Sequence, residues 1–142
     1  YIRCPKYDFD SVNVATWSLS LGMLPPRVNV VVTAIYLSMI LGYKKINVVG
    51  VDMDRMKNLE VDQESNATGF RVDYFYNNED KPFFGQHKLK GRTGLPVYIR
   101  FMRESSTFKW FALVNSYSKK RGVILCNASE YSLIDSIDRC EL

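Results

Sequence analysis

The residues of this sequence that are best suited to chemistry are acidic side chains that follow a short apolar run. Asp52 comes directly after residues 46–51, which are apolar apart from Asn47. A carboxylate after a buried strand loses its hydration unless it meets a base, a metal, backbone amides or a ligand hydroxyl. Asp54, two residues later, either binds a ligand or is a solvated loop acid. Asp52 is therefore the first candidate for a catalytic role, and Asp54 is a candidate ligand-binding residue.

A second group of candidates lies where helices begin and strands end. Asn29 precedes the apolar segment 30–41, and its amide oxygen can accept a hydrogen bond from the first turn of a helix. In the functional interpretation Asn29 and the nearby Arg27 also contact a ligand; in the alternative Asn29 only caps its helix. Asn127 and Ser129 follow another short apolar run and are candidate ligand contacts.

The middle of the chain holds the remaining candidates. His87 is the only histidine, and an imidazole can act as a general base near neutral pH. The alternative is a solvated loop histidine. Tyr74 and Tyr76 lie on either side of Phe75 in an alternating segment, so a tyrosine can face a cleft while Phe75 packs. Their alternative is a place in the core or at its rim.

An alternating pattern of strands and helices must position these residues. Residues 12–18 alternate as a strand does, and residues 30–41 are apolar on nearly every side, which predicts a core helix between a sheet and a second layer. Gly42 is expected to end that helix. Residues 46–51 then predict a buried parallel strand, which completes a βαβ unit.

The second half of the chain continues this pattern. The expected elements are an outlying strand at 70–76, a helix from Ser106 to about 121, a buried strand at 123–126 and a short helix over 132–138. The fold class is therefore α/β, with a Rossmann-like parallel sheet flanked by helices. We expect residues 1–142 to form one domain, and this domain to be the C-terminal half of a larger one in a longer chain.

In such a fold the candidates converge. A right-handed βαβ unit brings the start of its helix to the sheet edge where its strands end, so Asn29 should lie near Asp52 and Asp54. By the same logic residues 105–107 should share an edge with residues 127–129. Open α/β sheets bind ligands at this edge, and helix N-termini there favour phosphate.

Composition and charge limit the function classes. The 142 residues are 46% hydrophobic and 24% charged, which excludes disordered and low-complexity chains. The net charge of +4 favours anionic partners such as phosphates, anionic lipid headgroups or acidic sugars. The longest apolar run is too short to span a bilayer, and the start of the chain lacks a signal-peptide pattern.

The cysteines give no sign of a metal site. Cys4, Cys126 and Cys140 form no C-x-x-C pair, and an odd number cannot all pair internally. A disulfide framework and a zinc site are therefore not expected, and a reducing cytosol fits the sequence better.

Two blocks of the sequence resemble a known family. Arg27-Val-Asn29 ahead of the apolar helix, and Leu41-Gly-Tyr-Lys-Lys-Ile46 running on to Gly50-Val-Asp52, resemble the second half of bacterial sialyltransferases of glycosyltransferase family 42. They also resemble a wider group of Rossmann-type surface-polysaccharide and motility-accessory proteins. Asn127-Ala-Ser-Glu130 with the following Ile134-Asp135 is similar to a branch of the same group.

The resemblance implies transfer of a sugar from a nucleotide donor, typically a CMP-linked nonulosonic acid, to a bacterial surface glycan. It implies no metal, and we expect no other cofactor. Together with the cysteines and the net charge, it leads us to expect a cytoplasmic protein with peripheral contact to the anionic inner membrane and no nucleic-acid partner. Matching positions place these residues at the nucleotide or the donor: Arg27, Asn29, Gly50, Asp52, Asn127 and Ser129.

This chain also departs from the family pattern. Asn29-Val-Val stands where the family has Thr-Ser-Gly, Asp54 stands for a tyrosine, and the catalytic histidine has no aligned counterpart, which leaves His87 as the candidate. The glycine-rich nucleotide-binding opening is absent. A non-catalytic nucleotide- or sugar-binding domain and a pterin-type pyrophosphokinase are therefore the alternative functions.

Overall fold

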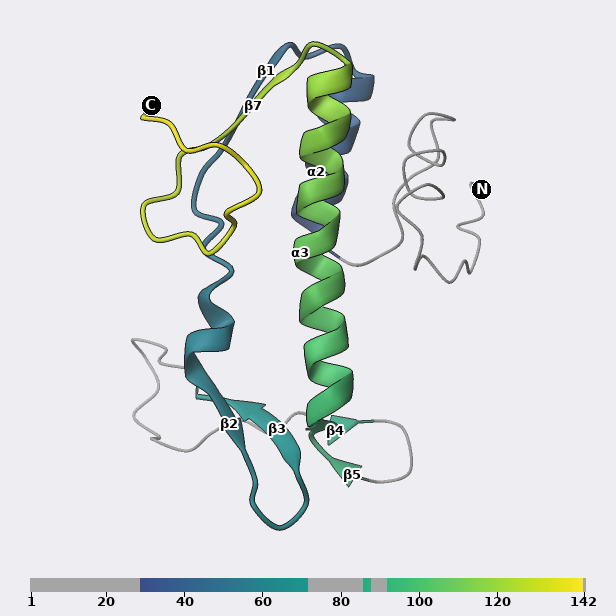
Figure 1. Cartoon of the computed structure of the whole chain (residues 1–142), viewed down its shortest axis with the longest axis vertical. Helices are drawn as coiled ribbons and strands as arrows, with labels where there is room; N and C mark the ends of the chain where they lie inside the picture. The colour runs from purple at the N-terminus through teal and green to yellow at the C-terminus, as the bar shows by residue number, and fades with distance from the viewer. Residues whose placement is uncertain (1–28, 72–85, 88–91, 142) are drawn as a thin grey trace. The chain divides into compact units, whose positions relative to one another are not determined.

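The computed structural model describes residues 29–71, 86–87 and 92–141 (Figure 1). The chain divides into two compact units by its internal contacts. Unit 1 has residues 29–52 and 106–141 as its described part, and unit 2 spans residues 53–105. The expected strand at 12–18 lies outside the described residues.

Helix α2 (Val30–Ile40) forms where it was predicted. Asn29 is its N-cap in an extended conformation, and its side-chain oxygen accepts a hydrogen bond from the Val31 amide at 2.7 Å. Gly42 adopts a φ of 94° directly after the C-cap residue, as expected for the end of a helix.

Only one face of α2 is buried. Its buried residues are Val32, Ile35, Tyr36 and Met39. The opposite face is apolar but exposed, with Val30 80% and Leu41 75% accessible. The predicted burial of this helix on both sides is therefore wrong in the described structure.

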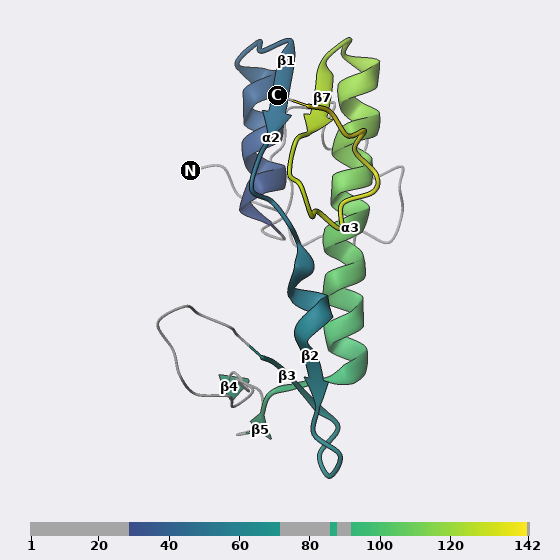
Figure 2. The same cartoon turned by 90° about the vertical axis from the view of Figure 1, so that its left-hand side faces the viewer.

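Strand β1 (Lys45–Val48) pairs in parallel with β7 (Ile124–Asn127), with Val48 opposite Asn127. The predicted parallel pairing of the two strands is confirmed. The predicted burial and length of the first strand are wrong, because β1 ends at Val48, Asn47 is exposed and Val49 is 56% exposed. Figures 1 and 2 show α2 and α3 on one face of the pair. The described structure is thus mixed α/β, with a two-stranded parallel sheet and two helices.

Helix α3 (Val97–Lys120) begins well before the predicted cap at Ser106. Neither glycine nor proline interrupts residues 97–120, so the helix continues through the serines. In unit 1 it buries Trp110, Phe111 and Val114. It packs on α2 through Tyr117, whose ring centroid lies 5.7 Å from that of Tyr36.

This packing also changes the acidity of Tyr36. Burial raises the pKa of the Tyr36 hydroxyl, and the neighbouring Tyr117 raises it further, while Arg121 opposes the change. The phenol therefore stays neutral to a higher pH than a free tyrosine.

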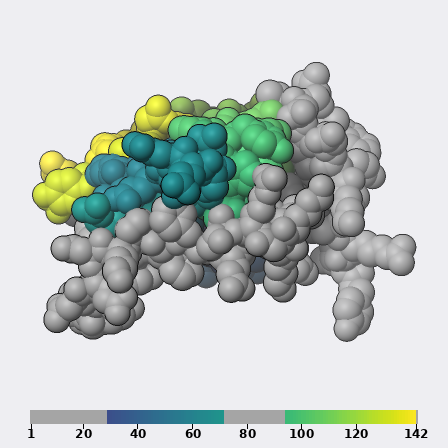
Figure 3. Space-filling model, turned by 90° about the horizontal axis from the view of Figure 1, so that it is seen from below, coloured from purple at the N-terminus to yellow at the C-terminus, as the bar shows by residue number. Residues whose placement is uncertain are grey.

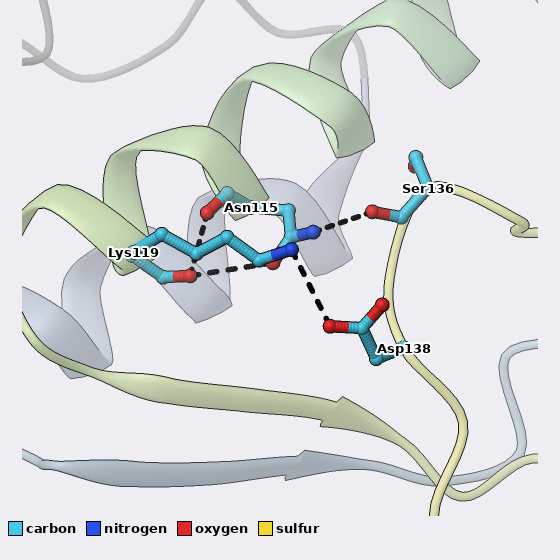
Figure 4. Close-up of polar contacts among 5 residues, drawn as sticks. Asn115, Lys119, Ser136 and Asp138 are labelled. Atoms are coloured by element: carbon cyan, nitrogen blue, oxygen red, sulfur yellow. Dashed lines mark hydrogen bonds and ion pairs between the residues drawn. The ribbon is translucent and has the colours of Figure 1, made fainter.

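The segment after β7, which we call the C-terminal strap (residues 132–138), is irregular rather than the predicted helix. Ile134 and Ile137 are almost completely buried, and their spacing of three resembles a helical pattern. Polar contacts hold the strap to α3. The side-chain Nδ2 of Asn115 donates to the Ser136 carbonyl oxygen at 2.5 Å, and Lys119 Nζ lies 3.4 Å from Asp138 Oδ2 (Figure 4).

Unit 2 is built from short strands. A 3-10 helix η1 (Asp54–Asn58) leads into an antiparallel sheet of β2 (Leu59–Val61), β3 (Ala67–Phe70) and β6 (Leu95–Pro96). Strands β4 (Gln86–His87) and β5 (Arg92–Thr93) form a separate antiparallel pair. The expected strand at 70–76 overlaps β3 only at Phe70, and residues 72–76 lie outside the described residues.

Two local features stabilise the sheet of unit 2. Asp62 accepts hydrogen bonds from the Ser65 amide at 2.8 Å and from the Ser65 hydroxyl at 2.6 Å, and these bonds lower the pKa of the Asp62 carboxyl. The guanidinium carbon of Arg100 lies 4.5 Å from the ring centroid of Phe70, a cation–π contact.

None of the described helices is long and apolar enough to cross a membrane.

Candidate functional site

The segments that leave β1 and β7 meet at the carboxyl edge of the parallel pair. The Ala128 amide donates to the Val48 carbonyl oxygen at 2.8 Å. The Val51 amide donates to the Ser129 hydroxyl oxygen at 2.9 Å, although the two residues are 78 positions apart. The predicted convergence of these two segments is therefore present in unit 1.

Two further bonds extend this junction into the strap. The Ser132 hydroxyl donates to the Val51 carbonyl oxygen at 2.7 Å, and the Leu133 amide donates to the Asp52 carbonyl oxygen at 2.7 Å. Ser132 and Leu133 were not among the predicted site residues. Their contacts depend on the path of the strap, which a local sequence pattern does not determine.

A pocket of about 690 Å³ opens at the carboxyl end of β7. Residues 127–130 form one wall and residues 139–141 form the other. The pocket is shallow and largely open to solvent. In Figure 3 the C-terminal residues, in yellow, are visible at the surface. Asn127 and Ser129, both predicted to contact ligand, line this pocket.

Asn127 is almost fully buried, and its side chain already makes hydrogen bonds inside the protein. Its Oδ1 accepts from the Ser129 amide at 3.1 Å, and its Nδ2 donates to the Ile134 carbonyl oxygen at 3.4 Å. Ser129 Oγ accepts from Val51, which leaves its hydroxyl hydrogen for another acceptor. Asn127 therefore shapes the pocket, and Ser129 can also donate into it.

Arg139 is a pocket residue that the sequence analysis missed. Its guanidinium donates to the carbonyl oxygens of Ser129, Glu130 and Ser132. It thereby links the two walls of the pocket. A single arginine without a recurring motif gives no local signal for this role.

The other charged groups at the pocket are acidic. Glu130 and Glu141 line it, and a side-chain hydrogen bond to Glu130 raises the pKa of the exposed Tyr131 hydroxyl. Carboxylates accept hydrogen bonds from hydroxyl groups and repel phosphate. The pocket lining therefore favours a hydroxyl-bearing part of a ligand, such as a sugar or a ribose.

A disulfide joins Cys126 in β7 to Cys140 in the opposite wall, with Cα atoms 6.0 Å apart and 14 positions between them in sequence. The sequence led us to expect no disulfide framework, and it did not predict this single bridge. An odd cysteine count excludes complete pairing but allows a single bridge. The residues brought together by the strap decide which two cysteines meet.

The surroundings of Asp52 differ from those predicted. Its side chain is exposed, and no hydrogen bond or ion pair of its carboxylate is found within the described part of the chain. The Asp52 backbone is bonded to Leu133, but the residue is exposed, so the predicted loss of hydration does not occur. Gly50 has a φ of 68°, and a Cβ atom added there would meet no atom within 4 Å.

Asn29 and Asp52 both belong to unit 1. Helix α2 and strand β1 run in opposite directions, so the start of α2 and the carboxyl end of β1 lie at the same end of the pair (Figures 1 and 2). Asn29 acts there as a helix cap, the second of the two roles that the sequence left open. Neither residue lines the pocket.

The remaining candidates lie elsewhere. Asp54 is exposed at the start of η1, and His87 lies in β4 opposite Arg92; both belong to unit 2. The predicted helix start at residues 105–107 is wrong, because these residues lie inside α3. The positions outside the described residues are Arg27, Tyr74 and Tyr76.

Within residues 29–71, 86–87 and 92–141, no three His, Cys, Asp or Glu side chains form a group that could hold a metal ion.

Comparison with known proteins finds no matching family model, no matching curated protein and no matching solved structure. The resemblance to sialyltransferases stays a prediction from the sequence.

Proposed function

We propose that this chain binds a nucleotide-sugar donor at the carboxyl edge of its parallel strands, as part of a glycosyltransferase that acts on a bacterial surface glycan. The observation that carries the proposal is the pocket at the end of β7, lined by Asn127 and Ser129. Ligands of α/β sheets bind at this edge of the strands. The proposal includes a Rossmann-like arrangement of the complete domain.

The lining of the pocket supports a role for the sugar or ribose in recognition. Glu130 and Glu141 can accept hydrogen bonds from ligand hydroxyls, and Ser129 can donate one. In the proposed reaction a base, for which His87 is the candidate, deprotonates the acceptor hydroxyl during displacement at the anomeric carbon. Asp52 is the proposed donor contact nearest to β1.

A non-catalytic nucleotide- or sugar-binding domain is the second candidate. The internal hydrogen bonds of Asn127 favour this candidate. A side-chain amide whose oxygen and nitrogen are both bonded within the protein is less free to change its contacts during a reaction. The pyrophosphokinase remains the third candidate, and it differs from the others in requiring ATP.

The proposal also covers location and partners. It places the protein in the cytoplasm at the anionic inner membrane, with a glycan as acceptor and no nucleic acid. The Cys126–Cys140 disulfide weighs against a permanently reducing compartment, because cytosolic reductants keep most thiols reduced.

Calorimetric titration of the full chain with CMP, UDP, GDP and ATP–magnesium separates these functions. Binding of CMP or UDP supports the donor-binding proposal, and hydrolysis or transfer of the matching nucleotide sugar supports the transferase. Binding of ATP with magnesium would favour the kinase. Absence of binding by all four nucleotides contradicts the proposal.

The Asp52→Asn variant tests the residue expected to contact the donor. Because the Asp52 side chain is exposed, we expect its melting temperature to stay unchanged. Loss of one charged hydrogen bond should weaken donor binding by about 1.5 to 3 kcal/mol, roughly ten- to a hundredfold. Asp135→Asn, at an exposed aspartate of the strap, is the matched control. Equal affinities of both variants would remove Asp52 from the site.

A further inference from the structure

We propose that the Cys126–Cys140 disulfide is a redox-sensitive latch, which fixes one wall of the pocket and releases it on reduction without unfolding unit 1. The consequence for ligand binding rests on the proposed function. The latch itself rests only on how the two walls are attached.

Few contacts attach the wall formed by residues 139–141. The Asn127 amide donates to the Asp138 carbonyl oxygen at 2.9 Å, and the Cys140 amide donates to the Asn127 carbonyl oxygen at 3.2 Å. Together these two bonds form the parallel bridge between Asn127 and Arg139. The disulfide is the one covalent tie in this part of the described chain.

The guanidinium of Arg139 also spans the pocket, but Arg139 is exposed. Its hydrogen bond to the Glu130 carbonyl oxygen is exposed to water, whereas its bonds to the Ser129 and Ser132 carbonyl oxygens are partly buried. The covalent bond keeps these partners together. Once it is broken, the wall after Asp138 is held by the Cys140–Asn127 backbone bond and by the hydrogen bonds of Arg139, with no covalent tie.

The preceding strap is attached independently of the disulfide. Ile134 and Ile137 are buried in the core of unit 1, and the Asn115 side chain holds the Ser136 carbonyl oxygen (Figure 4). The Ser132 hydroxyl holds the chain after β1. Reduction should therefore loosen the wall after the strap and leave the core packed.

The sulfur atoms differ in access. Cys126 is 6% exposed within β7, whereas Cys140 is partly exposed and lines the pocket. The thiolate of a dithiol reductant can attack Cys140 Sγ, and the S–S electron pair then leaves with Cys126 Sγ, which takes up a proton. The second thiol of the reductant displaces Cys140 as a thiol. In total the reductant loses two electrons and two protons and becomes a disulfide, and the protein gains two thiols.

Such an equilibrium suits regulation by the redox state of the surroundings. Disulfides in cytosolic proteins are most often transient or redox-sensing. A latch of this kind would give the pocket one form under oxidising conditions and another under reducing conditions.

Hydrogen exchange of the full chain tests the latch. The protein is compared after treatment with oxidised glutathione and after treatment with dithiothreitol, and free thiols are counted in each sample. We expect reduction to speed exchange of the Cys140 amide by about tenfold or more, whereas the Asn127 amide, which is bonded to Asp138 of the strap, should change little. The amide of Val114, which is fully buried in α3, should be unchanged.

Variants separate the latch from other effects of the reductant. The double variant Cys126→Ser/Cys140→Ser should exchange like the reduced protein and should not respond to dithiothreitol. The matched control Cys4→Ser removes the remaining cysteine and should keep the full response.

Three results would overturn the proposal. Unchanged exchange at Cys140 means that other contacts fix the wall. A parallel rise at Val114 means that the disulfide supports the whole fold. Three free thiols after oxidation mean that the bridge does not form. If exchange responds but neither form binds CMP or UDP, the latch stands and the proposed function fails.

Discussion

At the scale of single residues, Gly50 allows two explanations to be separated. Its φ of 68° is one that side chains with a Cβ rarely adopt, and the space around an added Cβ is open. We expect Gly50→Ala to lower the free energy of unfolding by about 1 to 2 kcal/mol through backbone strain alone. Gly50→Asn should recover most of this loss, because asparagine tolerates the left-handed conformation. Urea denaturation measures both effects.

The same pair of variants addresses ligand approach. If Gly50→Asn keeps its stability but loses nucleotide binding, the glycine is needed for space beside the ligand. If it keeps both, the glycine is needed only for the turn. An asparagine variant less stable than the alanine variant would contradict the conformational explanation.

The residues also show what sequence can predict at this scale. The capping role of Asn29 could be predicted because it depends on the next two residues of its own helix. The exposure of Asp52 and the partners of Arg139 depend on distant segments and could not. The pairing of Cys126 with Cys140 could not be predicted for the same reason.

At the scale of elements, α2 presents two apolar faces with different surroundings. Ile35 is 3% exposed, whereas Leu41 at the end of the opposite face is 75% exposed. We expect Ile35→Ala to cost about 2 to 4 kcal/mol because it leaves a cavity. Leu41→Gln should change stability by less than about 0.5 kcal/mol. Thermal unfolding of the full chain compares the two.

A large loss of stability in Leu41→Gln would contradict the exposed face. It would mean that this side of α2 is covered in the folded protein, as the continuous apolar sequence of the helix predicts. Comparable losses for both substitutions would restore the expectation of a helix between two layers.

Elements were predictable where one local pattern had one structural meaning. The apolar runs that form β1 and β7 and the capped segment that forms α2 were predicted, including the parallel pairing. The start of α3 and the conformation of residues 132–138 were not. Serines that can cap a helix also fit inside one, and two isoleucines three apart can be buried without a helix.

At the scale of the whole molecule, the prediction of a single domain is untested, but the contacts separate two units with different interiors. Unit 1 buries large side chains completely, among them Tyr36, Phe111 and Ile134. In unit 2 the strands are two to four residues long. The sequence pattern did not predict this division, because it resides in contacts between distant segments.

Native-state hydrogen exchange should therefore show two levels of protection. In unit 1 the Ala128 amide donates to the Val48 carbonyl oxygen at 2.8 Å. In unit 2 the Asp62 amide donates to the Ala67 carbonyl oxygen at 2.8 Å, and the Arg71 amide donates to the Asn58 carbonyl oxygen at 2.9 Å. Because the bonds are similar in length, differences in exchange report on the opening of each unit. We expect Asp62 and Arg71 to exchange about a hundredfold faster than Ala128, which corresponds to about 2.7 kcal/mol. Equal rates would mean that both units open in one cooperative step and that the division has no energetic counterpart.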